Sequence, residues 1–117
     1  MRRTLIAIGI LLVAVPGAAL AQTKGKGIRL WNLTSETISG FQLSPAGKTE
    51  WGPNQCLNDK DKEVDHDERL RITGVTPGRY DAKFQDKKGR VCVVKNLDVK
   101  AGGIFSIEER QVSNCQK

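Results

Sequence analysis

The chain has 117 residues and a formal net charge of +6, and acidic and basic residues are mixed along most of its length. A nucleic-acid-binding protein would instead gather its basic residues into a stripe with aromatic residues between them, so we expect no nucleic-acid partner. The length holds one small domain, and no segment after residue 21 is apolar enough to cross a membrane.

Residues 1–21 have the pattern of a secretory signal peptide. They begin with the pair Arg2-Arg3, continue with an apolar run over residues 5–15, and end in small residues. The apolar run is shorter than the roughly 20 residues that a permanent membrane-spanning helix needs. We therefore expect cleavage between Ala21 and Gln22 and a periplasmic or secreted protein. The paired arginines leave export by the general or the twin-arginine route open.

The remaining chain divides into a polar, glycine-rich leader, residues 22–27, and a single domain, residues 28–117. Short segments of alternating apolar and polar residues, separated by turns rich in glycine and proline, fill this domain. The predicted strands are residues 28–33, 37–43, 68–73, 79–85, 90–99 and 104–110. This spacing predicts an all-β fold, namely a small antiparallel β-sandwich of about six to seven strands.

Alternation also predicts which side chains face the core. Tyr80, Ala82 and Phe84 alternate with polar residues, and we expect them on the buried face. In the next strand the apolar residues Val91, Val93, Leu97 and Val99 share one phase, so we expect them to point to the same side.

Residues 70–112 resemble the second half of the prealbumin-like, or carboxypeptidase-regulatory-type, β-sandwich domains. The motif positions that carry this resemblance are Val75, Pro77, Gly78, Tyr80, Asp86, Gly89, Leu97, Val99, Ala101 and Gly102. The first half, with NLTSETISGFQLSPAGKTEWGPN, is similar to small, uncharacterised exported bacterial proteins. Both resemblances imply a fold, and neither supplies functional residues.

The domain contains three cysteines, and an oxidising compartment favours their pairing. An odd number predicts one disulfide plus either a free thiol or an intermolecular bond, which would give a disulfide-linked dimer. If residues 90–99 and 104–111 form a hairpin, the C-terminal tail can return to the first strand. We therefore prefer Cys92 with Cys115 and a free Cys56, although all three pairings stay open. The absence of a C-x-x-C motif argues against zinc.

The segment 57–68 has carboxylates at four ligand positions of a 12-residue EF-hand loop. These residues are Asp59, Asp61, Asp65 and Glu68. However, Leu57 occupies the first position, Lys62 occupies the sixth, and no helices flank the loop. A calcium-binding or calcium-stabilised module is therefore an alternative to a plain solvated loop.

Three residues mark a candidate binding surface around the one long irregular segment of the chain. Trp51 precedes a Gly-Pro-Asn turn, and it is either a platform for a sugar ring or a partner, or a cap over one end of the core. Asn54 and His66 lie in the segment that follows. Separately, Asn32 begins an N-glycosylation sequon.

No motif for an activated nucleophile occurs. His66 is the only histidine, and because adjacent residues of an extended chain point to opposite sides, neither Asp65 nor Asp67 is well placed to orient its ring. Cys56 as a nucleophile is conceivable, but an exported thiol is more often oxidised. We predict no catalytic residue, and a hydrolase is the second alternative.

These patterns together predict an exported, non-enzymatic binding module of the bacterial envelope, with no cofactor unless the acidic loop holds calcium. The expected partner is another envelope protein, a surface polysaccharide or a small ligand bound at the long loop.

Overall fold

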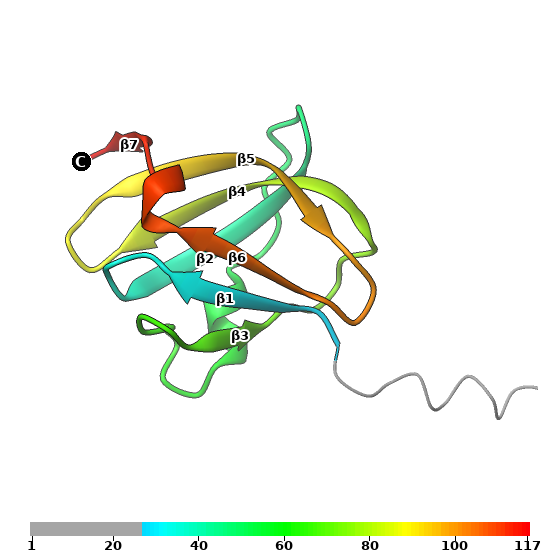
Figure 1. The fold of residues 1–117 in the computed structure, drawn as a ribbon, viewed down its shortest axis with the longest axis horizontal. Coiled ribbons are helices and arrows are strands. Elements are labelled where there is room, and N and C mark those ends of the chain that lie inside the picture. Colours follow the sequence, from blue (N-terminus) through cyan, green and yellow to red (C-terminus); the bar gives the residue numbers. More distant parts are fainter. Residues whose placement is uncertain (1–26) are drawn as a thin grey trace, which may run out of the picture.

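The computed structural model describes residues 27–117. The predicted signal peptide, its cleavage site and residues 22–26 of the predicted leader lie outside the described residues. Seven strands form two sheets that pack face to face around one core (Figure 1). The strands are β1 (Arg29–Leu33), β2 (Ile38–Pro45), β3 (Arg69–Arg71), β4 (Gly78–Asp86), β5 (Val91–Val99), β6 (Ile104–Glu108) and β7 (Asn114–Gln116).

The predicted all-β sandwich is confirmed. One sheet has the order β3-β1-β6 and the other has the order β2-β4-β5-β7. The only helical elements among residues 27–117 are two 3₁₀ turns, η2 (Gln55–Asn58) and η3 (Glu109–Gln111). No helix in this range is long and apolar enough to cross a membrane.

The strand pairs are antiparallel except for one. β1 and β6 run parallel, with Leu30 opposite Phe105 and Asn32 opposite Ile107. The predicted hairpin of residues 90–99 and 104–111 was wrong, because β5 pairs with β4 and β7 whereas β6 lies in the other sheet. The chain crosses between the sheets after β5, so β6 enters beside β1 in the same direction.

The core is formed by the inward side chains of both sheets. Phe41 of β2 and Phe105 of β6 contact each other across the sandwich, with ring centroids 6.2 Å apart. In β4, Ala82 and Phe84 are buried as predicted, and Tyr80 packs against the core from its edge.

The prediction that Val91 and Val93 point to the core side of β5 together with Leu97 and Val99 was wrong in the first half of the strand. Cys92 and Val94 are buried, and Val91 is 38% exposed. The phase changes at a bulge between Val94 and Leu97, which oppose Ala82 and Tyr80 of β4. One extra residue in a strand turns all later side chains to the other face. Leu97 is therefore buried on the same side as Cys92 and Val94, although the alternation predicted it on the opposite side.

The preferred disulfide is confirmed. Cys92 of β5 and Cys115 of β7 lie directly opposite each other in the register and are bonded. The short strand β7, which no sequence pattern predicted, brings the C-terminal tail back to β5. The cysteine pairing was thus correct, although the hairpin from which it was argued does not form.

Candidate ligand-binding site on the four-stranded sheet

A row of mainly polar side chains crosses the outer face of the β2-β4-β5-β7 sheet. Gln42 lies opposite Lys83, Lys83 opposite Val93, and Val93 opposite Asn114. Because successive side chains of a strand point to opposite faces, these residues point away from the core that their chain neighbours fill. The row supplies a flat, polar floor.

Trp51 lies over this floor. The chain after β2 turns back along the free edge of that strand: the Gly52 N–H donates to the Leu43 carbonyl (2.9 Å), and Gln42 Nε2 donates to the Gly52 carbonyl (2.9 Å). This brings the Trp51 ring beside Lys83, whose Nζ is 5.0 Å from the ring centroid. At this distance the ammonium is attracted to the π face of the ring. Trp51 is therefore on the outer face of the sheet, and it does not cap the core.

A hollow of about 450 Å³ adjoins Trp51, and we call it the Trp51 hollow. Lys48, Lys95, Asp81 and Asn114 contribute to its lining. The Asp81 carboxylate is buried and accepts backbone hydrogen bonds from Gly47 (3.1 Å) and Asn96 (3.0 Å). Its two oxygens are therefore already engaged by the protein.

The charge that the Trp51 hollow offers to a ligand is positive. Within residues 27–117, neither Lys48 nor Lys95 takes part in an ion pair. Both side chains are exposed residues of the lining. The hollow thus combines an aromatic face with two ammonium groups and the amide of Asn114.

The other two predicted surface residues have different positions. Asn54 Oδ1 accepts from the backbone N–H groups of Phe41 and Cys56, both at 3.0 Å, so it joins the edge of β2 to the start of η2. His66 Nδ1 lies 2.6 Å from the Thr34 carbonyl, in the loop between β1 and β2. Neither side chain lines the Trp51 hollow.

The structure does not gather the four carboxylates of the predicted calcium loop. Asp59 accepts from the Asp61 N–H (2.8 Å), Asp65 accepts from the Thr37 hydroxyl (2.9 Å), and Glu68 accepts from the Asp65 N–H (3.0 Å). In the described part of the chain, no group of three or more His, Cys, Asp or Glu side chains is placed to hold a metal ion. Calcium binding stays a prediction, without support from this geometry.

Cys56 is the free cysteine and is fully buried, with its Sγ 3.7 Å from the Ile38 carbonyl. Burial, together with the nearby charges of Asp59 and Glu63, raises the pKa of this thiol to about 12. A protonated, inaccessible thiol is a poor nucleophile. A dimer through this cysteine, the alternative to a free thiol, would need the core to open, because the Cys56 thiol is buried.

The sequon residue Asn32 is also fully buried. Its Nδ2 donates to the Val64 carbonyl (2.9 Å) and the Glu36 carbonyl (3.0 Å), and its Oδ1 accepts from the Thr34 N–H and hydroxyl. The folded protein therefore does not offer this amide to a glycosylating enzyme. Its role is structural, since it satisfies backbone groups of the β1–β2 loop and the carbonyl of Val64.

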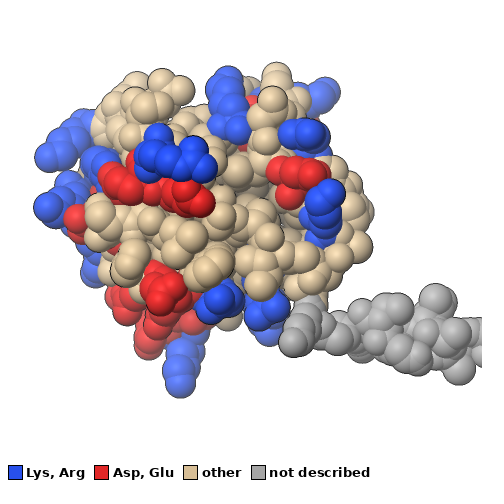
Figure 2. Space-filling view, viewed as in Figure 1, with Lys and Arg blue, Asp and Glu red and all other residues tan. Residues whose placement is uncertain are grey.

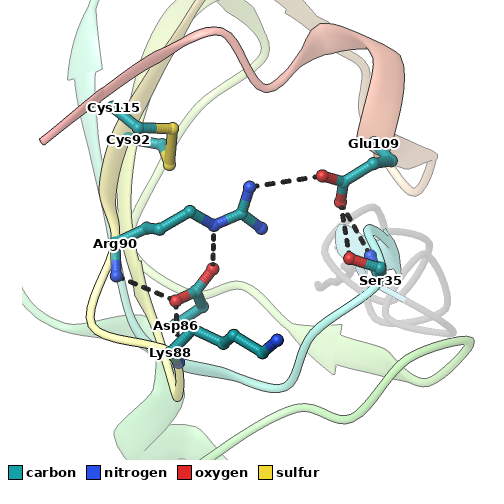
Figure 3. Close-up of a disulfide and its surroundings, with 7 residues drawn as sticks. All are labelled: Ser35, Asp86, Lys88, Arg90, Cys92, Glu109 and Cys115. Carbon is teal, nitrogen blue, oxygen red and sulfur yellow. Dashed lines mark hydrogen bonds and ion pairs between the residues drawn. A yellow bond between two sulfur atoms is a disulfide. The ribbon is translucent and has the colours of Figure 1, made fainter. Parts of the chain in front are cut away.

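Sequence reasoning missed a charged cluster beside the disulfide (Figure 3). Arg90 Nε donates to Asp86 Oδ2 (2.7 Å), and the other oxygen of Asp86 accepts the N–H groups of Lys88 and Arg90. Arg90 Nη1 reaches Glu109 (3.2 Å), which also accepts the N–H and hydroxyl of Ser35. The cluster connects the β4–β5 turn, η3 and the β1–β2 loop.

Two acids of this cluster have lowered pKa values. Burial alone would raise the pKa of Asp86, but the hydrogen bonds and charge of Arg90, with the Lys88 N–H, outweigh burial and lower it. The pKa of Glu109 is lowered chiefly by the Ser35 N–H, against burial, and further by Arg90. Favourable contacts to the charged forms mark this cluster as a stabilising element.

No protein-family model matches this chain, and neither a curated protein nor a solved structure gives a significant match to it. The geometry alone therefore defines its class: a small, disulfide-bonded β-sandwich with an aromatic, positively charged hollow on the outer face of one sheet.

Proposed function

We propose that this protein is an exported, non-enzymatic binding module of the bacterial envelope, and that it holds an acidic polysaccharide in the Trp51 hollow. The observation that carries the proposal is the combination of the Trp51 ring with two lysines that have no ion-pair partner in the described chain. The disulfide supports export, because disulfides persist in oxidising compartments. The signal-peptide pattern of residues 1–21 supports it as well.

The choice of ligand follows from the chemistry of the lining. An aromatic ring offers an apolar face to the C–H side of a sugar ring, and it loses little conformational entropy on binding because its side chain is stiff. Lys48 and Lys95 attract carboxylates, and Asn114 can donate to and accept from hydroxyl groups. The open form of the hollow, on the surface of a sheet, suits a segment of a polymer.

Binding of a soluble polyuronate, with neutral dextran as the uncharged comparison, tests the proposal. The chain has two tryptophans, so Trp31→Phe leaves Trp51 as the only tryptophan reporter for fluorescence titration. We expect saturable binding of the polyuronate and none of dextran. Trp51→Ala, followed by calorimetry, should weaken binding at least tenfold, which corresponds to about 1.4 kcal/mol.

Lys48→Gln/Lys95→Gln should weaken polyuronate binding and reduce its salt dependence. The matched control is Lys60→Gln/Lys117→Gln, which removes the same charge from exposed positions outside the hollow. If the control weakens binding as much as the hollow variant, or if Trp51→Ala leaves binding unchanged, the proposed site is wrong.

A further inference from the structure

The outer face of the β3-β1-β6 sheet carries three arginines. Arg29 of β1 lies directly opposite Arg71 of β3, and Trp31 lies opposite Arg69. Leu30 and Leu70, which alternate with them, are buried, so the arginines lie on the side of the sheet that faces away from the core. We call Arg29, Arg69 and Arg71 the arginine face.

The positive charge of this face is not balanced by its neighbours. Within residues 27–117, none of the three arginines takes part in an ion pair. The Arg29 Nε is buried and has no hydrogen-bond partner in the described part of the chain. Like charges directly opposite each other on a sheet destabilise it. The arrangement therefore lowers the stability of the free domain, and an anionic partner would relieve that cost.

Apolar groups lie among these charges. The Arg69 guanidinium is stacked on the Trp31 ring, 4.4 Å from its centroid. Ile104 of β6 lies opposite Arg29 on its other side and is 44% exposed, which makes it one of three large exposed apolar residues in the described chain. An amphipathic ring and an aliphatic side chain beside basic groups are typical of surfaces at the membrane–water interface.

The acidic residues near this sheet lie at the end away from Arg29 and Arg71. Asp67 accepts from Trp31 Nε1 (3.0 Å), and Glu108 pairs with Arg110 (2.8 Å). Glu68 accepts from the backbone of the same loop (3.0 Å). Figure 2 shows blue side chains beside the start of the described chain and red ones farther from it. The face thus has a positive end, where Arg29, Arg71 and Ile104 form one row across the strands.

We propose that the arginine face docks on a bilayer surface that contains anionic phospholipid. The planar guanidinium group binds phosphate oxygens through two parallel N–H donors, so several arginines on one side of a sheet match an array of phosphate headgroups. A flat sheet fits a flat partner. This inference does not rest on the proposed function, since the Trp51 hollow lies on the outer face of the other sheet.

Vesicle co-sedimentation tests this inference with the whole protein. We expect binding to vesicles of phosphatidylglycerol and phosphatidylcholine, no binding to phosphatidylcholine alone, and release by added salt. Each basic side chain near an anionic bilayer increases partitioning about fivefold, so Arg69→Gln/Arg71→Gln should reduce it about thirtyfold. Both arginines are exposed, and circular dichroism checks that the variant folds.

Two comparisons separate the arginine face from general charge attraction. Arg69→Lys/Arg71→Lys keeps the charge but removes the paired N–H donors, so it should bind more weakly than the unaltered protein and more strongly than Arg69→Gln/Arg71→Gln. Lys60→Gln/Lys117→Gln removes the same charge elsewhere and should change partitioning less than threefold. The inference is overturned if the protein does not bind anionic vesicles, or if Arg69→Gln/Arg71→Gln binds them as well as the unaltered protein does. It is also overturned if Lys60→Gln/Lys117→Gln loses as much vesicle binding as Arg69→Gln/Arg71→Gln. Trp51→Ala should leave vesicle binding unchanged even where it abolishes polysaccharide binding.

Discussion

The disulfide between Cys92 and Cys115 closes a loop that passes through both sheets. Its ends are 23 residues apart, and the loop runs from β5 of the four-stranded sheet through β6 of the other sheet and back to β7. The disulfide therefore lowers the conformational entropy of the unfolded chain over this segment. During folding, β6 of the segment has to pair with β1 in one sheet and β7 has to pair with β5 in the other. We expect reduction of the disulfide to be the largest single loss of stability in this domain.

The length of the loop that the disulfide closes sets the size of the expected loss of stability. For a loop of this size, the chain-entropy model gives about 3.4 kcal/mol at 25 °C. In a domain of fewer than 100 residues, each kcal/mol shifts the melting temperature by about 4–8 °C, so reduction should lower it by roughly 14–27 °C. A 100-residue domain has only about 5–15 kcal/mol of total stability.

Thermal melting followed by circular dichroism, with and without a phosphine reductant, measures the effect. Mass spectrometry after thiol alkylation in denaturant, which exposes Cys56, should count one free thiol before reduction and three after it, since the chain has three cysteines and one disulfide. Cys92→Ala/Cys115→Ala should melt low in both conditions. Cys56→Ala, the control, should keep the full response to reductant. An unaltered protein whose melting temperature does not respond to complete reduction would refute the entropic argument.

Three further outcomes are expected. Because the pKa values of Asp86 and Glu109 are lowered from 3.8 and 4.5, their stabilisation is complete above these ordinary values and is lost as the pH falls through the lower native ones. Urea titrations from pH 6 to pH 2 should therefore show a smaller acid loss for Asp86→Asn than for the unaltered protein, and equal losses would contradict the assignment. Asn32→Ala should cost about 1–3 kcal/mol, because buried backbone groups lose their partner, whereas the exposed Asn114→Ala should stay within about 0.5 kcal/mol in the same titration. If the acidic loop binds calcium, millimolar calcium should raise the melting temperature and Asp61→Asn/Asp65→Asn should abolish that rise, whereas an unchanged melting temperature would remove the calcium hypothesis.

The sequence alone located nearly all of the strands. Alternation of apolar and polar residues and the turns rich in glycine and proline are local signals, so they identify β1 to β6 without knowledge of their neighbours. The three-residue strand β7 has no such signal, because its pairing with β5 and the disulfide hold it in place rather than its own pattern.

The sequence also named the aromatic residue of the candidate site, but not its setting. The turn after Trp51 left a surface platform and a cap over the core as alternatives, whereas the position of the ring over Lys83 depends on hydrogen bonds between residues 42, 43 and 52. The acidic loop had the spacing of a metal site without its geometry, because spacing along a chain does not make carboxylates converge.

Only the tertiary structure decided which strand joins which sheet. The crossing after β5 makes β1 and β6 parallel, the pairing of β1 with β3 places Arg29 opposite Arg71, and the packing of the loop around Val64 encloses Asn32. Each of these contacts joins residues that are far apart in the chain, and their energies come from burial and pairing across the sandwich. A single sequence carries the local preferences of its segments, whereas the contacts between distant segments exist only once the two sheets have packed.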